Sequence, residues 1–236
     1  MDLVRDIGFI AAYWGGFSAF FSAWQLCIMQ ISPFFLFFAA GFYLTEARHS
    51  KNPIRALLLV FLAYLITFSI IFAFMGIPRF GISRYLLYNK EALKTVAAIY
   101  TGLLALYLVL CGIYQKRRVR PIAYLPAGAL LGASLAVAYS PCITPAMSDI
   151  MNFAGKPENV MKGYYLLLSY AVGLSTAFVL SGAAIALVLD HLTGKNPLIR
   201  KLAIGFAALV LFAFSFLLAS GLMTSYKSFL VGLVLD

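Results

Sequence analysis

The side chains best suited to chemistry in this sequence are its three cysteines, Cys27, Cys111 and Cys142. Cys27 and Cys142 each stand in a long apolar stretch, and they are separated by nearly half of the 236-residue chain. Two thiols hold two electrons that they give up on forming a disulfide, and they pass these electrons on by thiol–disulfide exchange, which requires a thiolate and access to a partner. Cys27 and Cys142 are therefore candidates for a redox-active dithiol.

Cys142 lies between two prolines, in the run SPCITP at 140–145. Each proline lacks the N–H that a helix needs and disrupts the preceding turn. A helix break at membrane depth is tolerated only where the freed backbone is buried in protein or lines a wet cavity. Pro141 and Pro145 therefore predict an irregular, water-accessible position for Cys142, with Thr144 lining the cavity. The alternative is a proline-kinked helix in which this cysteine only packs.

Cys27 lies in the run WQLCIMQISP at 24–33. Amide side chains are costly in hydrocarbon unless they are hydrogen-bonded, so Gln25 and Gln30 predict a face turned towards other helices or a cavity. Pro33 predicts a break in the helix beyond the cysteine. By itself Cys27 is interpreted as a packing residue. It becomes a candidate for the dithiol because its position in the first half of the chain matches that of Cys142 in the second half.

Four other side chains that could do chemistry lack such a match. Cys111 has no counterpart in the second half of the chain and is interpreted as a structural thiol. Asp149 follows Cys142 by about two helical turns, where it either accepts the thiol proton or marks the polar end of a span. His49 and His191 have no partners at ligand spacing, so no metal site is predicted.

The elements that must position the cysteines are membrane spans. The chain is 63% hydrophobic and 11% charged, with a mean hydropathy of +0.94, whereas soluble domains carry about 25% charged residues. This composition excludes a soluble globular enzyme, a disordered chain and a disulfide-rich secreted module. Six uncharged stretches can each cross a hydrocarbon core of about 30 Å as a helix. They are residues 7–45, 56–78, 95–115, 121–148, 163–189 and 202–226.

The predicted fold class is an all-α polytopic membrane protein with six transmembrane helices. Stretch 7–45 is nearly twice the necessary length, so we expect it to be tilted, broken or preceded by an interfacial segment such as residues 7–16. The phenylalanine-rich run at 34–38 is expected to contact lipid. Gly128, Gly132 and Gly173 are expected to permit close contact between helices.

The six predicted spans divide into two similar halves. Counted from Cys27 and from Cys142, the next two spans begin at matching distances if one loop differs slightly in length. Three spans per half place the halves in opposite orientations, which gives the inverted repeat of many transporter folds. We therefore predict one repeat at 1–115 and a second at 116–236, within one integral membrane domain.

The basic residues predict the orientation in a cell membrane, either an inner or a plasma membrane. Loops 46–55, 116–120 and 190–201 hold more of the Lys and Arg residues than the loops of the opposite side. Because such residues concentrate in cytoplasmic loops, both termini are predicted to be extracytoplasmic. The net charge of +10 comes from residues at span ends, where they meet lipid headgroups, so nucleic-acid binding is not indicated.

With these features the chain resembles the CcdA family, which is related to the membrane domain of the thiol reductase DsbD. The resemblance covers nearly the whole chain: six spans, two inverted halves and one cysteine in spans one and four. The match is good at PCIxP, residues 141–145. It is poorer at the first cysteine, because Leu26 and Gln30 stand where the family commonly has prolines.

The resemblance implies a carrier of reducing equivalents across the membrane. Cytoplasmic thioredoxin would reduce a Cys27–Cys142 disulfide, and the dithiol would then reduce an extracytoplasmic thioredoxin-like protein that serves cytochrome c maturation or related thiol reduction. Two sulfurs hold the two electrons, so no cofactor is implied. Pro33, Pro141 and Pro145 would act as hinges for alternating exposure of the dithiol to the two sides.

Two other functions fit parts of the pattern. A small solute or ion transporter of inverted-repeat fold, with incidental cysteines, would need polar or charged groups at mid-membrane. Such groups are scarce in these stretches. A membrane scaffold would need partner-binding surface, which the short loops offer little of.

Overall fold

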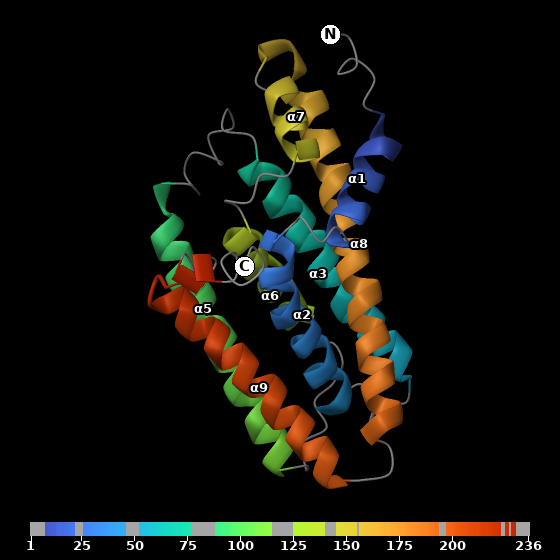
Figure 1. Ribbon diagram of the computed structural model, residues 1–236, viewed down its shortest axis with the longest axis vertical. Coiled ribbons are helices and arrows are strands. Elements are labelled where there is room, and N and C mark those ends of the chain that lie inside the picture. The colour runs from blue at the N-terminus through green and yellow to red at the C-terminus, as the bar shows by residue number, and fades with distance from the viewer. Residues whose placement is uncertain are drawn as a thin grey trace.

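The computed structural model describes residues 8–21, 26–45, 52–76, 88–114, 125–139, 145–154, 156–193, 197–222, 225–226 and 228–229. Within these residues the ordered elements are helices (Figure 1). They are α1 (Phe9–Phe21), α2 (Leu26–Thr45), α3 (Pro53–Met75), α5 (Lys90–Tyr114), α6 (Leu125–Tyr139), α7 (Pro145–Ala154), the short 3₁₀ helix η3 (Pro157–Asn159), α8 (Val160–Thr193) and α9 (Pro197–Ala219).

Four helices, α3, α5, α8 and α9, are long and apolar enough to cross a membrane. Each carries large apolar side chains on its outer face. On α3, for example, Leu58, Leu62 and Ile66 recur once per turn and are exposed. Such a stripe is stable against hydrocarbon and would be costly in water. The protein is therefore a multi-pass membrane protein.

The two expected spans that contain Cys27 and Cys142 each comprise two helices. Stretch 7–45 holds α1 and α2, and stretch 121–148 holds α6 and the beginning of α7. Residues 9–16 of the suggested interfacial segment belong to α1, which continues to Phe21, and their place relative to the membrane stays a prediction. Helices of 13 residues (α1) and 10 residues (α7) rise only about 20 Å and 15 Å, so neither crosses a bilayer alone.

The longest helix, α8, holds much of the bundle together (Figure 1). Its first half packs against α1, where Ser169 Oγ donates a hydrogen bond to the carbonyl oxygen of Phe9 at 2.7 Å. Its second half packs against α2, where Tyr43 Oη donates to Asp190 Oδ2 at 3.5 Å. Helix α3 packs against both α8 and α6, and α5 pairs with α9.

Two close helix contacts depend on glycine, and they have the same geometry. A Cβ atom at Gly132 of α6 would lie 2.7 Å from the carbonyl oxygen of Tyr64 and 3.1 Å from the amide nitrogen of Phe68, both on α3. A Cβ atom at Gly16 of α1 would collide with the carbonyl of Tyr170 and lie 3.0 Å from the amide nitrogen of Leu174, both on α8. The close approach expected from Gly132 is confirmed, as are those at Gly128 and Gly173.

Three of the four phenylalanines in the run at 34–38 of α2 are buried in protein, so their expected contact with lipid is wrong, whereas Phe37 is partly exposed. The Phe34 ring stacks on Phe214 of α9 with centroids 4.3 Å apart, and the Phe35 ring lies 4.4 Å from that of Tyr64. Phe38 is likewise buried. The reason is position, because α2 packs between α8 and α9 and not at the edge of the bundle.

Alanine at Gly132 tests the close packing of α6 on α3. We expect Gly132→Ala to lower the free energy of unfolding by about 1–3 kcal/mol, because the backbone of α3 must shift to admit the methyl group. Thermal unfolding followed by circular dichroism in detergent measures this. Gly205→Ala is the matched control, since nothing lies within 4 Å of its added Cβ atom. Equal unfolding temperatures in the two variants would contradict the packing.

Candidate functional site

The predicted site residues divide into those that the structure describes and those that it does not. Cys27 is the second residue of α2, Gln30 lies in the same helix and Pro145 begins α7. The side chains of these three residues are outside the described part. Outside it altogether are Gln25, Pro141, Cys142 and Thr144, so the Cys27–Cys142 pair remains a prediction.

Three candidates are placed by their helices. Pro33 lies inside α2, which continues to Thr45, so the chain is helical on both sides of this proline and its role as a hinge stays a prediction. Asp149 is exposed on α7, whereas its neighbour Ile150 is buried. This exposure favours the interpretation that Asp149 marks the polar end of a span over the interpretation that it accepts the thiol proton. Cys111 lies near the end of α5, three residues before Tyr114.

An aromatic cluster joins the end of α1 to the middle of α2. The Phe20 ring of α1 and the Phe35 ring of α2 lie 4.8 Å and 5.6 Å from the ring of Phe178, which is near the middle of α8. The ring of Phe35 also contacts Tyr64 of α3. The two helices of the first cysteine stretch therefore meet at the middle of α8, and Cys27 begins the second of them.

Two serines meet where α3 and α8 cross. Ser69 Oγ and Ser175 Oγ are 3.3 Å apart and buried. Ser175 Oγ is also 2.8 Å from the carbonyl oxygen of Ala171. A polar side chain inside a membrane helix usually faces another helix and is hydrogen-bonded. This pair was not predicted from the sequence, because stretch 56–78 has one serine but stretch 163–189 has three, Ser169, Ser175 and Ser181.

The contacts of α3 and α8 repeat along the chain with a constant spacing. The same number of residues separates Tyr64 from Tyr170, Phe68 from Leu174 and Ser69 from Ser175. Tyr64 and Phe68 of α3 contact Gly132. In the same way, Tyr170 and Leu174 of α8 contact Gly16. The two serines contact each other. The crossing of α3 and α8 therefore has the pairing expected of a local two-fold relation.

The second half departs from this relation at α7. Helix α2 packs against both α8 and α9, whereas α7 packs mainly against α8 and η3. Figure 1 shows α7 at the end of the molecule beside the start of α8, and α2 within the bundle. The two helices that adjoin the cysteines are thus held differently.

Apart from Asp190, one of whose carboxylate oxygens is buried, the buried polar side chains among the described residues carry hydroxyl groups, not charges. In addition to Ser69 and Ser175 they are Thr101 and Ser134, which donate to the carbonyl oxygens of Ala97 and Leu130 within their own helices at 2.8 Å. Within the described residues, the buried Tyr64 hydroxyl has no hydrogen-bond partner. No cluster of three His, Cys, Asp or Glu residues suited to a metal ion occurs in the part that the structure describes.

Comparison with known proteins gives two relatives that match most of the chain. A protein of Halalkalibacterium halodurans named "Cytochrome c-type biogenesis protein CcdA" is 22% identical over 93% of each chain. A "Thiol:disulfide interchange protein DsbD" of Ralstonia nicotianae is 23% identical over 78% of this chain and 31% of its own length. The chain is a homologue of CcdA and DsbD.

The relation to CcdA and DsbD confirms the resemblance stated from the sequence. A third relative, the "Putative cytochrome c-type biogenesis protein" of Haemophilus influenzae, is 27% identical over 35% of this chain and 38% of its own length. No protein-family model matches the chain. No solved structure matches it either.

A pair of cysteines introduced at the two serines tests the crossing of α3 and α8. In a variant without native cysteines, we expect Ser69→Cys with Ser175→Cys to form a disulfide on mild oxidation, because the Oγ atoms are 3.3 Å apart. Electrophoretic mobility after cleavage between the helices measures the crosslink. Ser69→Cys with Ser215→Cys is the control, since Ser215 bonds to Ala98 on α5. A crosslink in the control alone would contradict the crossing.

Proposed function

We propose that the protein carries reducing equivalents across the membrane from cytoplasmic thioredoxin to an extracytoplasmic thioredoxin-like protein, with Cys27 and Cys142 as the redox pair. The observation that carries the proposal is homology to CcdA over 93% of the chain, together with a cysteine at each divided stretch. The thiol:disulfide interchange named for DsbD supports the same chemistry. The product of the pathway would be reduced thiols for cytochrome c maturation or a related use.

The chemistry requires only sulfur. A thioredoxin thiolate attacks one sulfur of the Cys27–Cys142 disulfide and forms a mixed disulfide, and the second thiol of thioredoxin then releases the reduced pair. The pair attacks the acceptor disulfide in the same way, so two electrons and two protons pass to the acceptor. An acceptor about 100 mV more oxidising than thioredoxin makes the transfer favourable by about 4–5 kcal/mol.

The fold supports alternating exposure of the pair through an inverted repeat of residues 1–115 and 116–236. Support comes from the matching contacts of α3 and α8 and from the division of each cysteine stretch into two helices. The different packing of α2 and α7 supports a state in which the two halves are not equivalent. If α7 took up the packing of α2 and α2 that of α7, the dithiol would be presented to the other side of the membrane.

A solute or ion transporter is the second candidate, and the structure does not favour it. A charged substrate needs polar or ionisable groups at mid-membrane. Among the described residues, the fully buried polar side chains are hydroxyls, and most of them bond to backbone carbonyls of their own helices. Asp190 has a buried carboxylate oxygen, but it lies near the end of α8 and not at its middle, and it accepts a hydrogen bond from Tyr43.

Capture of thioredoxin tests the redox pair. Oxidised wild-type protein is mixed with reduced thioredoxin that retains only its attacking cysteine, so that the reaction stops at the mixed disulfide. We expect a covalent adduct on non-reducing electrophoresis that dithiothreitol cleaves. Cys27→Ser and Cys142→Ser should lose the adduct because neither can form the internal disulfide.

Cys111→Ser is the matched control for this capture, because it removes a thiol but leaves the proposed pair intact. It should form the adduct as the wild type does. Wild-type protein that forms no adduct, or a Cys27→Ser variant that forms it undiminished, would show that the proposed pair is not the site of exchange.

Labelling of introduced cysteines tests the orientation. Tyr88, which is exposed before α5, and Asn52, which is exposed before α3, belong to opposite sides in the predicted topology. Each cysteine is introduced into a variant of the protein without native cysteines, and intact cells that contain it are treated with a membrane-impermeant maleimide. We expect the maleimide to label Tyr88→Cys in intact cells and to label Asn52→Cys only after lysis. The reverse pattern would place both termini in the cytoplasm.

A further inference from the structure

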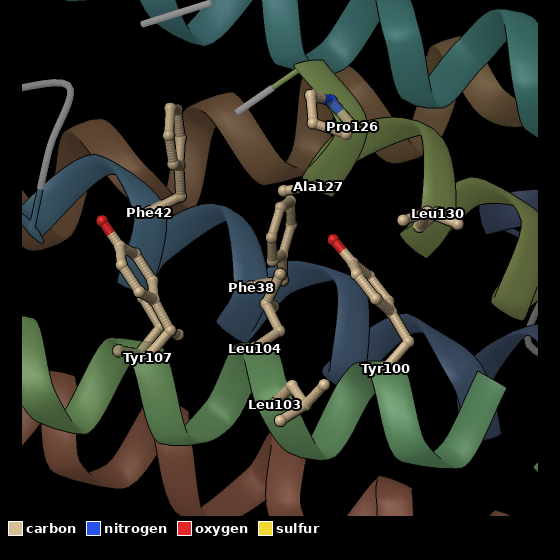
Figure 2. A pocket seen from close by; sticks show the side chains of 10 residues that line it. Phe38, Phe42, Tyr100, Leu103, Leu104, Tyr107, Pro126, Ala127 and Leu130 are labelled. Atoms are coloured by element: carbon tan, nitrogen blue, oxygen red, sulfur yellow. The ribbon is translucent and has the colours of Figure 1, made fainter. Parts of the chain in front are cut away.

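A cavity of about 330 Å³ lies between α2, α5 and α6. Figure 2 shows the rings of Tyr100 and Tyr107 rising from α5 into the space bounded by α2 and α6. The walls from α2 are the rings of Phe38 and Phe42, and Ala127 contributes the wall from α6. The cavity is therefore lined both by α2, the helix of Cys27, and by α6, the helix that precedes Cys142, and these two helices also contact each other.

The lining of the cavity is apolar except for two hydroxyl groups. Of the ten side chains in the described part of the chain that line it, only those of Tyr100 and Tyr107 carry a polar atom. An apolar cavity of this kind stays dry, because a buried water needs two to four polar partners. Left empty, it would forfeit the dispersion contacts of the side chains around it. Its occupant must therefore be largely hydrocarbon.

The cavity is continuous with the surface that faces lipid. Val96, Ile99, Leu103, Leu106 and Leu110 form a stripe of exposed apolar side chains along α5. Leu103 belongs both to this stripe and to the lining of the cavity, and so lies at its mouth. Across the mouth, Leu130 of α6 is also exposed. Because α5 is a candidate membrane span, the mouth opens sideways into the hydrocarbon of the bilayer.

We propose that this cavity binds the acyl chain of a membrane phospholipid, which enters between α5 and α6 and packs against α2. The volume suits this ligand: a cavity of about 150 Å³ holds one benzene ring, so 330 Å³ holds roughly a dozen carbon atoms. Tyr107 lies two turns along α5 from Tyr100, towards the end of the span, where its hydroxyl can meet the ester group of the lipid. The bound chain fills the space between the two helices that adjoin the cysteine segments.

Photochemical labelling tests the proposal on the full-length protein. The protein is reconstituted with phosphatidylcholine that carries a diazirine on one acyl chain, irradiated, and digested for mass spectrometry. Leu104 and Leu108 line the cavity and are only 8% and 3% exposed, so lipid around the outside of the bundle does not reach them. We expect adducts at these two residues as well as at Leu103. Adducts confined to the exposed stripe of α5 would overturn the proposal.

A variant that fills the cavity supplies a second, independent result. Ala127→Trp places an indole in the space, and we expect adducts at Leu104 and Leu108 to fall roughly tenfold, because a packed interior has no room for both groups. Ala213→Trp is the matched control, since Ala213 is exposed on α9 outside the cavity. Unchanged labelling of Leu104 and Leu108 in a folded Ala127→Trp protein would overturn the proposal. If that variant does not fold, the wild-type labelling pattern decides the question.

Discussion

Hydrocarbon offers no partner to a backbone N–H or C=O group, and this constraint shapes the whole molecule. A helix satisfies these groups within itself, so the segments that can cross the membrane are helical. Protein contacts hold the two helices of the first cysteine stretch together, since the aromatic cluster of Phe20, Phe35 and Phe178 packs both of them against α8. The same constraint explains why buried hydroxyls bond to carbonyls.

Much of the fold could be predicted from the positions of charged residues, because charge is costly in hydrocarbon and therefore marks the ends of apolar helices. The stretches at 56–78, 95–115, 163–189 and 202–226 each coincide with one long helix. Which helices face lipid and which are buried in the bundle could not be predicted, because apolar composition does not distinguish the two. The run at 34–38 shows this: the same phenylalanines would suit lipid, but they pack on Phe214 and Tyr64.

The candidate site was predictable in chemistry more than in geometry. Thiols paired across two halves pointed to exchange, and the homology to CcdA and DsbD agrees with that expectation. The serine pair and the glycine contacts depend on which faces of α3, α6 and α8 meet. A single sequence fixes the residues on each face but not the partner, since helix packing in lipid uses small residues that are common throughout such chains. Gly132 predicted a close contact between helices, but the sequence did not show that Tyr64 would be its partner.

The hydrogen bond between Ser69 and Ser175 joins two identical residues that play different parts. Ser175 Oγ donates its one proton to the carbonyl oxygen of Ala171 at 2.8 Å. Ser69 then supplies the proton between the two serines, and Ser175 accepts it. The donors therefore run in one direction, from α3 to the backbone of α8, and the crossing has a polarity even where its residues are the same.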